Sequence, residues 1–271
     1  MSEQRHIADS AEGASASNPT VDASRALRRA QRQAQRGLYA EAIGTLNAAM
    51  SLGADPYECY LRQARLYQSL GQWGDAVASA EKAIARKPHN VTARETIIAL
   101  LIESHDFGRA VEAIRDLLRI APDHVGARDA LGTAYVGLGD LDAALRVINE
   151  TIRLRPYDPI QRFRRGLIYE HKGEARLAIA EFSLVADLSE DEDLADSARE
   201  HLDDLDMAQL HDILLLAGDD PVFRTKLITN PEVAIAERGF GLSEWGLRRL
   251  AEFAAEGLTQ YGGSGTPLTY H

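Results

Sequence analysis

The sequence contains little cysteine and no long apolar run, and both features narrow the possible classes of protein. Among 271 residues the only cysteine is Cys59, which excludes an intrachain disulfide and a metal site built from several thiolates. No apolar run approaches the roughly 18–20 residues that a helix needs to cross a bilayer. The first 22 residues are polar and lack the apolar segment of a secretory signal. We therefore expect a cytoplasmic, bacterial protein that does not bind membranes, with residues 1–22 disordered.

The sequence also lacks the motifs that commonly mark catalytic and cofactor sites. It contains no Gly-rich phosphate loop, no HExxH pattern and no nucleophile elbow. His201 and His211 lie ten residues apart and could not hold one metal ion on a rigid helix. We therefore predict that the chain is not an enzyme and that it has no catalytic residue, no cofactor and no metal site.

Basic residues are scarce in one part of the chain, so the net charge of −11 is unevenly distributed. Between Asp187 and Asp220, thirteen acidic residues stand against a single basic one, Arg199, which gives this window a charge of −12. Such a chain is a poor general binder of nucleic acid, because phosphate groups would be repelled. A basic stripe on one helical face is formed by Arg25, Arg28, Arg29, Arg32 and Arg36. It indicates either a solvated outer face or a docking site for an acidic segment, for which residues 187–220 of this protein itself are one candidate.

The most informative feature is a repeat of 34 residues. In its best-formed copy, Tyr57 to Pro88, two short helices meet at Gly71, which can adopt the left-handed conformation that ends a helix. Pro88 ends the second helix. A hairpin of this size cannot bury its apolar faces alone, so it needs stacked neighbours. The residues that recur at 34-residue steps are Ala64, Gly132 and Gly166 at one position, Ala76, Ala110, Ala144 and Ala178 at a second, and Pro88, Pro122 and Pro156 at a third.

This pattern resembles the tetratricopeptide repeat (TPR) family, whose signature places those residue types at those offsets. The resemblance implies an all-α solenoid of about five helix-turn-helix repeats with a C-terminal helical module. The repeats would be 23–56, 57–90, 91–124, 125–158 and 159–190. After them we expect an acidic capping helix over 191–218, a small helical module over 219–257 and a flexible tail over 258–271.

In TPR arrays the first helix of each repeat lines a concave groove, and the resemblance implies that a protein partner binds there. The residues expected to contact it are Arg65, Glu95, Ile102, Val136, Ile160, Phe163, Leu167 and His171. We expect truncation of Phe163 to weaken binding without unfolding the array. Gly126 and Ala130 replace the Lys and Arg with which some TPR proteins hold a chaperone's C-terminal carboxylate, which disfavours that ligand. The sequence therefore predicts a scaffold or adaptor for an amphipathic helix or an extended segment.

The C-terminal residues suggest an alternative function. Asp220, Asn230 and Ser243 each stand at a typical helix start. The stretch FRTKLITNPEVAIAERGFGLSEWGLRRL is similar to the helical leader of nitrile-hydratase-type precursor peptides and to the small non-catalytic subunit of extradiol dioxygenases.

Either likeness implies that residues 220–257 dock onto an enzyme. In the leader version, a peptide-modifying enzyme recognises this module and alters the tail 258–271. In the other version, the chain is an accessory subunit of an enzyme complex. The remaining interpretation of the same residues is a purely structural helical cap.

Overall fold

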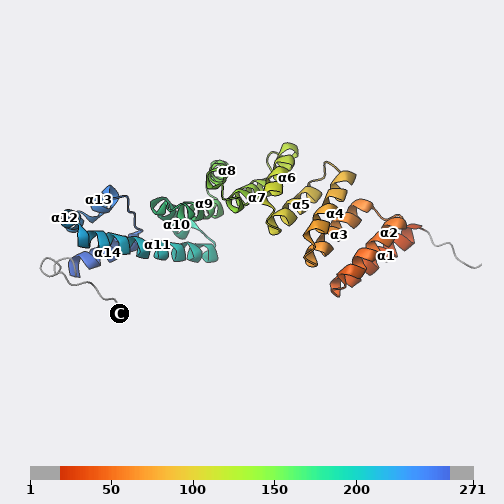
Figure 1. The fold of residues 1–271 in the computed structure, drawn as a ribbon, viewed down its shortest axis with the longest axis horizontal. Coiled ribbons are helices and arrows are strands. Elements are labelled where there is room, and N and C mark those ends of the chain that lie inside the picture. Colours follow the sequence, from red (N-terminus) through yellow and green to blue (C-terminus); the bar gives the residue numbers. More distant parts are fainter. Residues whose placement is uncertain (1–18, 257–271) are drawn as a thin grey trace, which may run out of the picture. The chain divides into compact units, whose positions relative to one another are not determined.

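The structure, a computed structural model, describes residues 19–256. Within this range every regular element is a helix, which confirms the prediction of an all-α protein. Figure 1 labels the helices in chain order. Their bounds are α1 (Pro19–Gln35), α2 (Tyr39–Ser51), α3 (Pro56–Ser69), α4 (Trp73–Arg86), α5 (Val91–Glu103), α6 (Phe107–Ile120), α7 (Val125–Gly137), α8 (Leu141–Leu154), α9 (Pro159–His171), α10 (Ala175–Leu188), α11 (Glu192–Asp219), α12 (Pro221–Thr229), α13 (Pro231–Glu237) and α14 (Glu244–Glu256).

The N-terminal boundary differs from the sequence expectation. Helix α1 begins at Pro19, so residues 19–22 are helical and not part of a disordered tail. Proline suits the first turn of a helix, where its missing N–H would have no partner inside the helix. The predictions for residues 1–18 and for the tail 258–271 lie outside the described residues.

The described residues divide into two compact units, unit 1 (19–130) and unit 2 (131–256), with the boundary inside α7. In unit 1, α1 packs on α2, α3 on α4 and α5 on α6, and neighbouring pairs meet through α2 with α3 and α4 with α5. In unit 2, α9 packs on both α8 and α10, and α10 packs on α11. Within each unit, neighbouring hairpins therefore bury apolar faces against one another, as a repeat array requires.

Tight turns of one recurring type join the two helices of a repeat. At Gly71 the backbone has φ +69°, and its N–H donates to the Gln68 carbonyl at 2.9 Å. The next N–H, from Gln72, donates to the Tyr67 carbonyl at 2.9 Å and closes the last turn of α3. Glycine adopts this left-handed conformation without strain because it has no Cβ. His105 has φ +59° at the equivalent position of the next repeat, in place of the usual glycine.

Small residues set the distance between packed helices. The recurring alanines that have no exposed surface are Ala64, Ala76, Ala110, Ala144 and Ala178. Gly166 shows the reason most directly, since a Cβ added there would lie 2.7 Å from the ring of Phe182. The recurring small positions of the sequence therefore mark close contacts between helices.

Replacing Ala76 with leucine is expected to lower the free energy of unfolding by about 1–3 kcal/mol, because the packed helices leave no room for a larger side chain there. Ala85 provides the matched control, since it is exposed on the same helix. Ala85→Leu should change stability by no more than about 0.5 kcal/mol. Urea unfolding followed by circular dichroism measures both variants. An Ala76→Leu protein as stable as the parent would contradict this packing.

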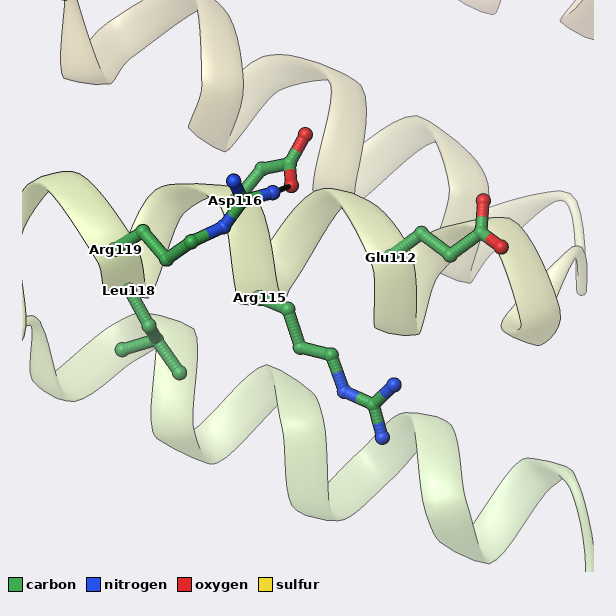
Figure 2. Close-up of a pocket in the computed structure, with 5 residues that line it drawn as sticks. All are labelled: Glu112, Arg115, Asp116, Leu118 and Arg119. Atoms are coloured by element: carbon green, nitrogen blue, oxygen red, sulfur yellow. Dashed lines mark hydrogen bonds and ion pairs between the residues drawn. The ribbon is translucent and has the colours of Figure 1, made fainter.

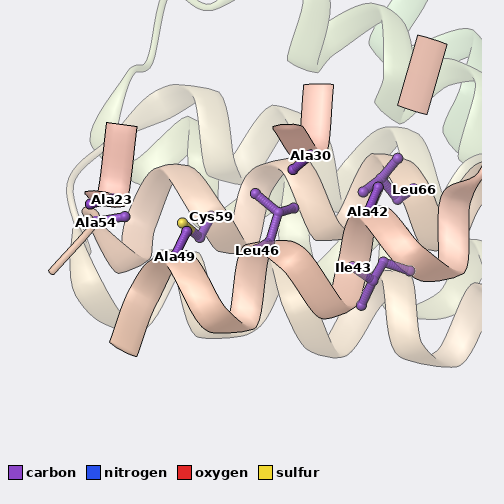
Figure 3. Packing of buried hydrophobic residues seen from close by; sticks show 9 residues of the cluster. All are labelled: Ala23, Ala30, Ala42, Ile43, Leu46, Ala49, Ala54, Cys59 and Leu66. Atoms are coloured by element: carbon purple, nitrogen blue, oxygen red, sulfur yellow. The ribbon is translucent and has the colours of Figure 1, made fainter. Parts of the chain in front are cut away.

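The first three helices enclose the N-terminal core of unit 1 (Figure 3). Helix α1 contributes Ala23 and Ala30, α2 contributes the fully buried Leu46, and α3 contributes Cys59 and Leu66. Burial raises the pKa of the Cys59 thiol. The thiol therefore stays protonated at neutral pH and packs as a small apolar group.

Helix α11 belongs to two hydrophobic clusters of unit 2. Its first half packs Ala198 and Leu202 against Phe182 of the last repeat. Its second half supplies Leu210 and Ile213 to a core that α12, α13 and α14 complete. One helix thus covers the last repeat and also supports the C-terminal helices.

Candidate partner-binding groove

Unit 1 contains a groove of about 630 Å³ on the side of its first helices. Helices α1, α3 and α5 all contribute to it, and α3 contributes most. Its apolar surface includes the buried Leu61 and Leu66. Its polar groups include Gln31 of α1, Arg65 of α3 and Thr92 of α5. The groove is thus of mixed character, as the sequence predicts for the first helices.

One wall of the groove is held by a cluster around Tyr57. Its hydroxyl donates to Asn90 Oδ1 at 2.7 Å, and the same oxygen accepts the Thr92 N–H at 2.9 Å and so caps α5. Lys87 Nζ lies 4.2 Å from the centre of the Tyr57 ring and pairs with Asp55 at 3.0 Å. The bond from Lys87 lowers the pKa of Asp55, and burial raises the pKa of Tyr57. These contacts join α3 to the start of α5 and fix the shape of the wall.

Two arginines carry the available positive charge of the groove. Arg62 and Arg65 are exposed on α3, and neither guanidinium group forms an ion pair or a hydrogen bond within residues 19–256. A guanidinium group offers several N–H donors to a carboxylate. Because both side chains stand beside buried leucines, the groove can accept an acidic side chain together with an apolar one.

The other two groove residues predicted in unit 1 lie outside this groove. Glu95 accepts a hydrogen bond from His124 Nε2 at 3.0 Å. The proton lies on Nε2 because His124 Nδ1 accepts the Ala127 N–H at 3.1 Å. Ile102 is half-buried. A role of Glu95 and Ile102 in partner binding stays a prediction.

In unit 2, three of the predicted contact residues face solvent. Val136 of α7 and Ile160 of α9 keep 44 % and 48 % of their surfaces exposed. His171, at the end of α9, is exposed as well. These three side chains are available to a partner, and their role stays a prediction.

Phe163, which the sequence predicts as a contact residue, is half-buried, and its role in binding stays a prediction. Its ring packs edge-on against Phe182, with centroids 5.4 Å apart, and against His201 at 5.7 Å. His201 comes from α11, stacks on Phe182 at 4.9 Å and pairs with Glu170 at 2.9 Å. Leu167 packs against the same cluster. Truncating Phe163 therefore removes internal packing, so an effect on binding could not be separated from a loss of stability.

A second depression, of about 670 Å³, lies along α6 (Figure 2). The residues that line it all come from this one helix: Glu112, Arg115, Asp116, Leu118 and Arg119. Asp116 and Arg119 form an ion pair with each other. Since one helix supplies all the lining residues within 19–256, this surface offers a partner less enclosure than the groove lined by α1, α3 and α5.

A buried carboxyl group that the sequence did not single out joins α11 to α14. Asp206 has no exposed surface and accepts both the N–H of Ser243, at 2.8 Å, and its hydroxyl. Ser243 Oγ in turn accepts the Gly246 N–H at 3.2 Å, which caps α14. A Cβ on Gly246 would lie 2.6 Å from the Asp206 carboxyl. The sequence does contain a sign of this burial, because Asp206 continues the apolar stripe of Leu202 and Leu210 at steps of four residues.

Asp206 predicts a specific pH dependence. Burial raises the pKa of its carboxyl, against the opposing effect of the bonds from Ser243. Above about pH 4, the unfolded chain has released this proton while the folded protein still holds it, so stability falls as pH rises through that window. Asparagine does not titrate. The stability of the parent relative to Asp206→Asn should therefore decline from pH 4 upward, until the folded carboxyl is itself ionised.

Urea unfolding of both proteins between pH 4 and 7 measures this difference. Asp212→Asn removes one negative charge from the exposed side of the same helix and serves as the control. If the stability of the parent relative to Asp206→Asn rose with pH, the raised pKa of Asp206 would be contradicted.

Within residues 19–256, no group of three or more His, Cys, Asp or Glu side chains is placed to hold a metal ion. None of the helices in that range combines the length and the apolar character needed to cross a bilayer.

These features define a helical-repeat protein whose first helices form a groove of mixed character. A family model described as tetratricopeptide repeat matches residues 14–164, which is more than half of the sequence. The chain belongs to the tetratricopeptide repeat family. The likeness of its C-terminal residues to leader peptides or to dioxygenase subunits has no such support.

Solved structures show the same fold. A MamA fragment from Desulfovibrio magneticus RS-1, residue 41 to the end, has a TM-score of 0.53 at 23 % identity, over 61 % of this chain and 94 % of that one. A tetratricopeptide repeat protein from Parabacteroides merdae ATCC 43184 has a TM-score of 0.55 at 20 % identity, over 89 % of this chain and 87 % of that one. At these identities the likeness concerns the fold. No functionally curated protein matches the chain in sequence.

Proposed function

We propose that this protein is a non-catalytic cytoplasmic scaffold or adaptor that binds a protein segment in the groove of its first helices. The observation that carries the proposal is the groove of unit 1, where the exposed Arg62 and Arg65 stand beside the buried Leu61 and Leu66. An amphipathic helix or extended segment with acidic and apolar side chains fits such a surface. We propose Val136, Ile160 and His171 of unit 2 as further residues that contact a partner.

The positive charge of Arg62 and Arg65 should make partner binding depend on salt. Arg62 and Arg65 are exposed, so ions in solution screen their attraction for carboxylates. Binding should therefore weaken as the salt concentration rises, mainly through slower association.

The test compares charge reversal inside and outside the groove. Arg62→Glu/Arg65→Glu should weaken binding of the protein that co-purifies with the parent chain by roughly tenfold or more, since it turns attraction into repulsion. Lys82→Glu/Arg86→Glu makes the same change of charge on exposed residues of α4. Calorimetric titration with the purified partner should give nearly the parent affinity for this control. Equal affinities for both variants would refute the groove as the binding site.

A second candidate function is that α12–α14 dock onto an enzyme. The observation that favours it is that these helices, although they pack in a core shared with α11, still expose apolar side chains, with Val222 67 % and Val233 49 % exposed. In the leader version the altered segment would be 258–271, which lies outside the described residues. Intact-mass measurement of the protein from its source cells tests that version. An unshifted mass would count against it.

A further inference from the structure

The outer face of α1 carries a row of arginines without partners. Arg28, Arg32 and Arg36 are exposed, on the side opposite the alanines that pack on α2. None of these three guanidinium groups forms an ion pair or a hydrogen bond within residues 19–256. Arg25, on the same face, pairs only with Asp22 of its own helix, at 3.3 Å. The structure thus shows a basic helical face with unused hydrogen-bond donors.

The outer face of α11 has the opposite charge. Asp193, Asp196, Glu200 and Asp204 are exposed, on the side opposite Ala198 and the other residues that pack on the last repeat. Asp196 pairs with Arg199 of the same helix at 2.5 Å. No ion pair engages the other three carboxylates within the described residues.

The two faces also match in length. The basic row, Arg25, Arg28, Arg32 and Arg36, has steps of three, four and four residues, and so does the acidic row from Asp193 to Asp204. At 1.5 Å per residue each row extends over about 16 Å. Two helices laid side by side could therefore pair all four arginines with all four carboxylates.

We propose that the basic face of α1 binds the acidic face of α11 from a second copy of this chain. Charge complementarity favours this occupant, because the chain itself supplies a surface of the right sign, spacing and length. A nucleic acid or an anionic membrane would match the arginines alone and would be repelled by the chain as a whole, whose net charge is −11. The contact joins two different surfaces, so a pair of copies keeps one free basic face and one free acidic face and can extend into a head-to-tail chain.

Sedimentation velocity of the full-length protein tests this proposal. At low ionic strength we expect association that grows with protein concentration, and it should disappear in about 0.5 M salt because exposed pairs are strongly screened. Arg28→Gln/Arg32→Gln should weaken self-association roughly tenfold, and Asp196→Asn/Glu200→Gln should do the same. Lys82→Gln/Arg86→Gln removes two exposed charges from α4 and should leave association unchanged.

Mixing the two neutralised variants gives the sharpest result. Each keeps only one fully charged face, so the mixture should form mainly 1:1 dimers of the two variants. A chain carrying Arg28→Glu/Arg32→Glu together with Asp196→Lys/Glu200→Lys should recover self-association, because the charges are exchanged. A parent protein that stays monomeric at low salt would overturn the proposal, as would oligomers insensitive to both variants. A monomer that merely becomes more compact at low salt would show that the contact forms within one copy, which also overturns it.

Discussion

Replacing Phe182 with alanine is expected to lower the free energy of unfolding of unit 2 by about 3–5 kcal/mol. The ring has no exposed surface and contacts both Phe163 and His201. Its removal would leave a cavity at the point where α9, α10 and α11 meet. Because repeats contact mainly their neighbours, the loss should be concentrated in unit 2.

The two tryptophans allow this to be measured in each unit separately. Trp73 lies in unit 1 and Trp245 in unit 2. In a Trp73→Phe background, urea unfolding followed by fluorescence should show an earlier transition for Phe182→Ala. In a Trp245→Phe background the transition should keep its midpoint. Phe163→Ala, where the ring is only half-buried, serves as the milder comparison. An unchanged Trp245 transition would contradict the aromatic cluster as a packing centre.

Replacing Phe223 with alanine is expected to destabilise the C-terminal helices by about 3–5 kcal/mol. Phe223 is 1 % exposed and lies in the core that α11 shares with α12, α13 and α14. The Asp206–Ser243 contact is not the only link between α11 and α14 in the described residues, because Leu250 of α14 lies in the same core.

Amide hydrogen exchange locates the effect. Protection should be lost in 221–256 and in the second half of α11, while 39–120 of unit 1 should exchange as in the parent. Phe253→Ala, on the half-buried side of α14, is the control and should change exchange much less. Loss of protection throughout the chain would show that the C-terminal helices are not a distinct part of unit 2.

The repeat pattern allowed the helices to be predicted well, for a physical reason. Each hairpin solves the same packing problem, so residues such as Ala76 and Gly166 recur wherever two helices must approach closely. Helix-capping residues also allowed the starts of the C-terminal helices to be predicted. Asp220 accepts the N–H groups of Val222 and Phe223, at 2.9 and 3.0 Å, at the predicted helix start.

Contacts made by the helix after the last repeat could not be predicted in the same way. The TPR register places Phe163 on a groove-facing position, but it does not say which helix covers that position at the end of the array. Here α11 brings His201 against Phe163 and hides part of the ring. Asp206 was counted with the acidic residues of its window because charge alone does not reveal burial. Its position on an apolar stripe was the better guide.

Partner binding in the groove of the first helices is tested most directly by site-specific photo-crosslinking in the source cells. A benzophenone side chain would be placed at position 65 in the groove or at position 112 on the outer surface of α6 (Figure 2). We predict that the probe replacing Arg65 forms one dominant adduct, whose peptide map shows a single acidic and apolar segment. The probe replacing Glu112 should not form this adduct. The same adduct from position 112, with none from position 65, would contradict binding in the groove.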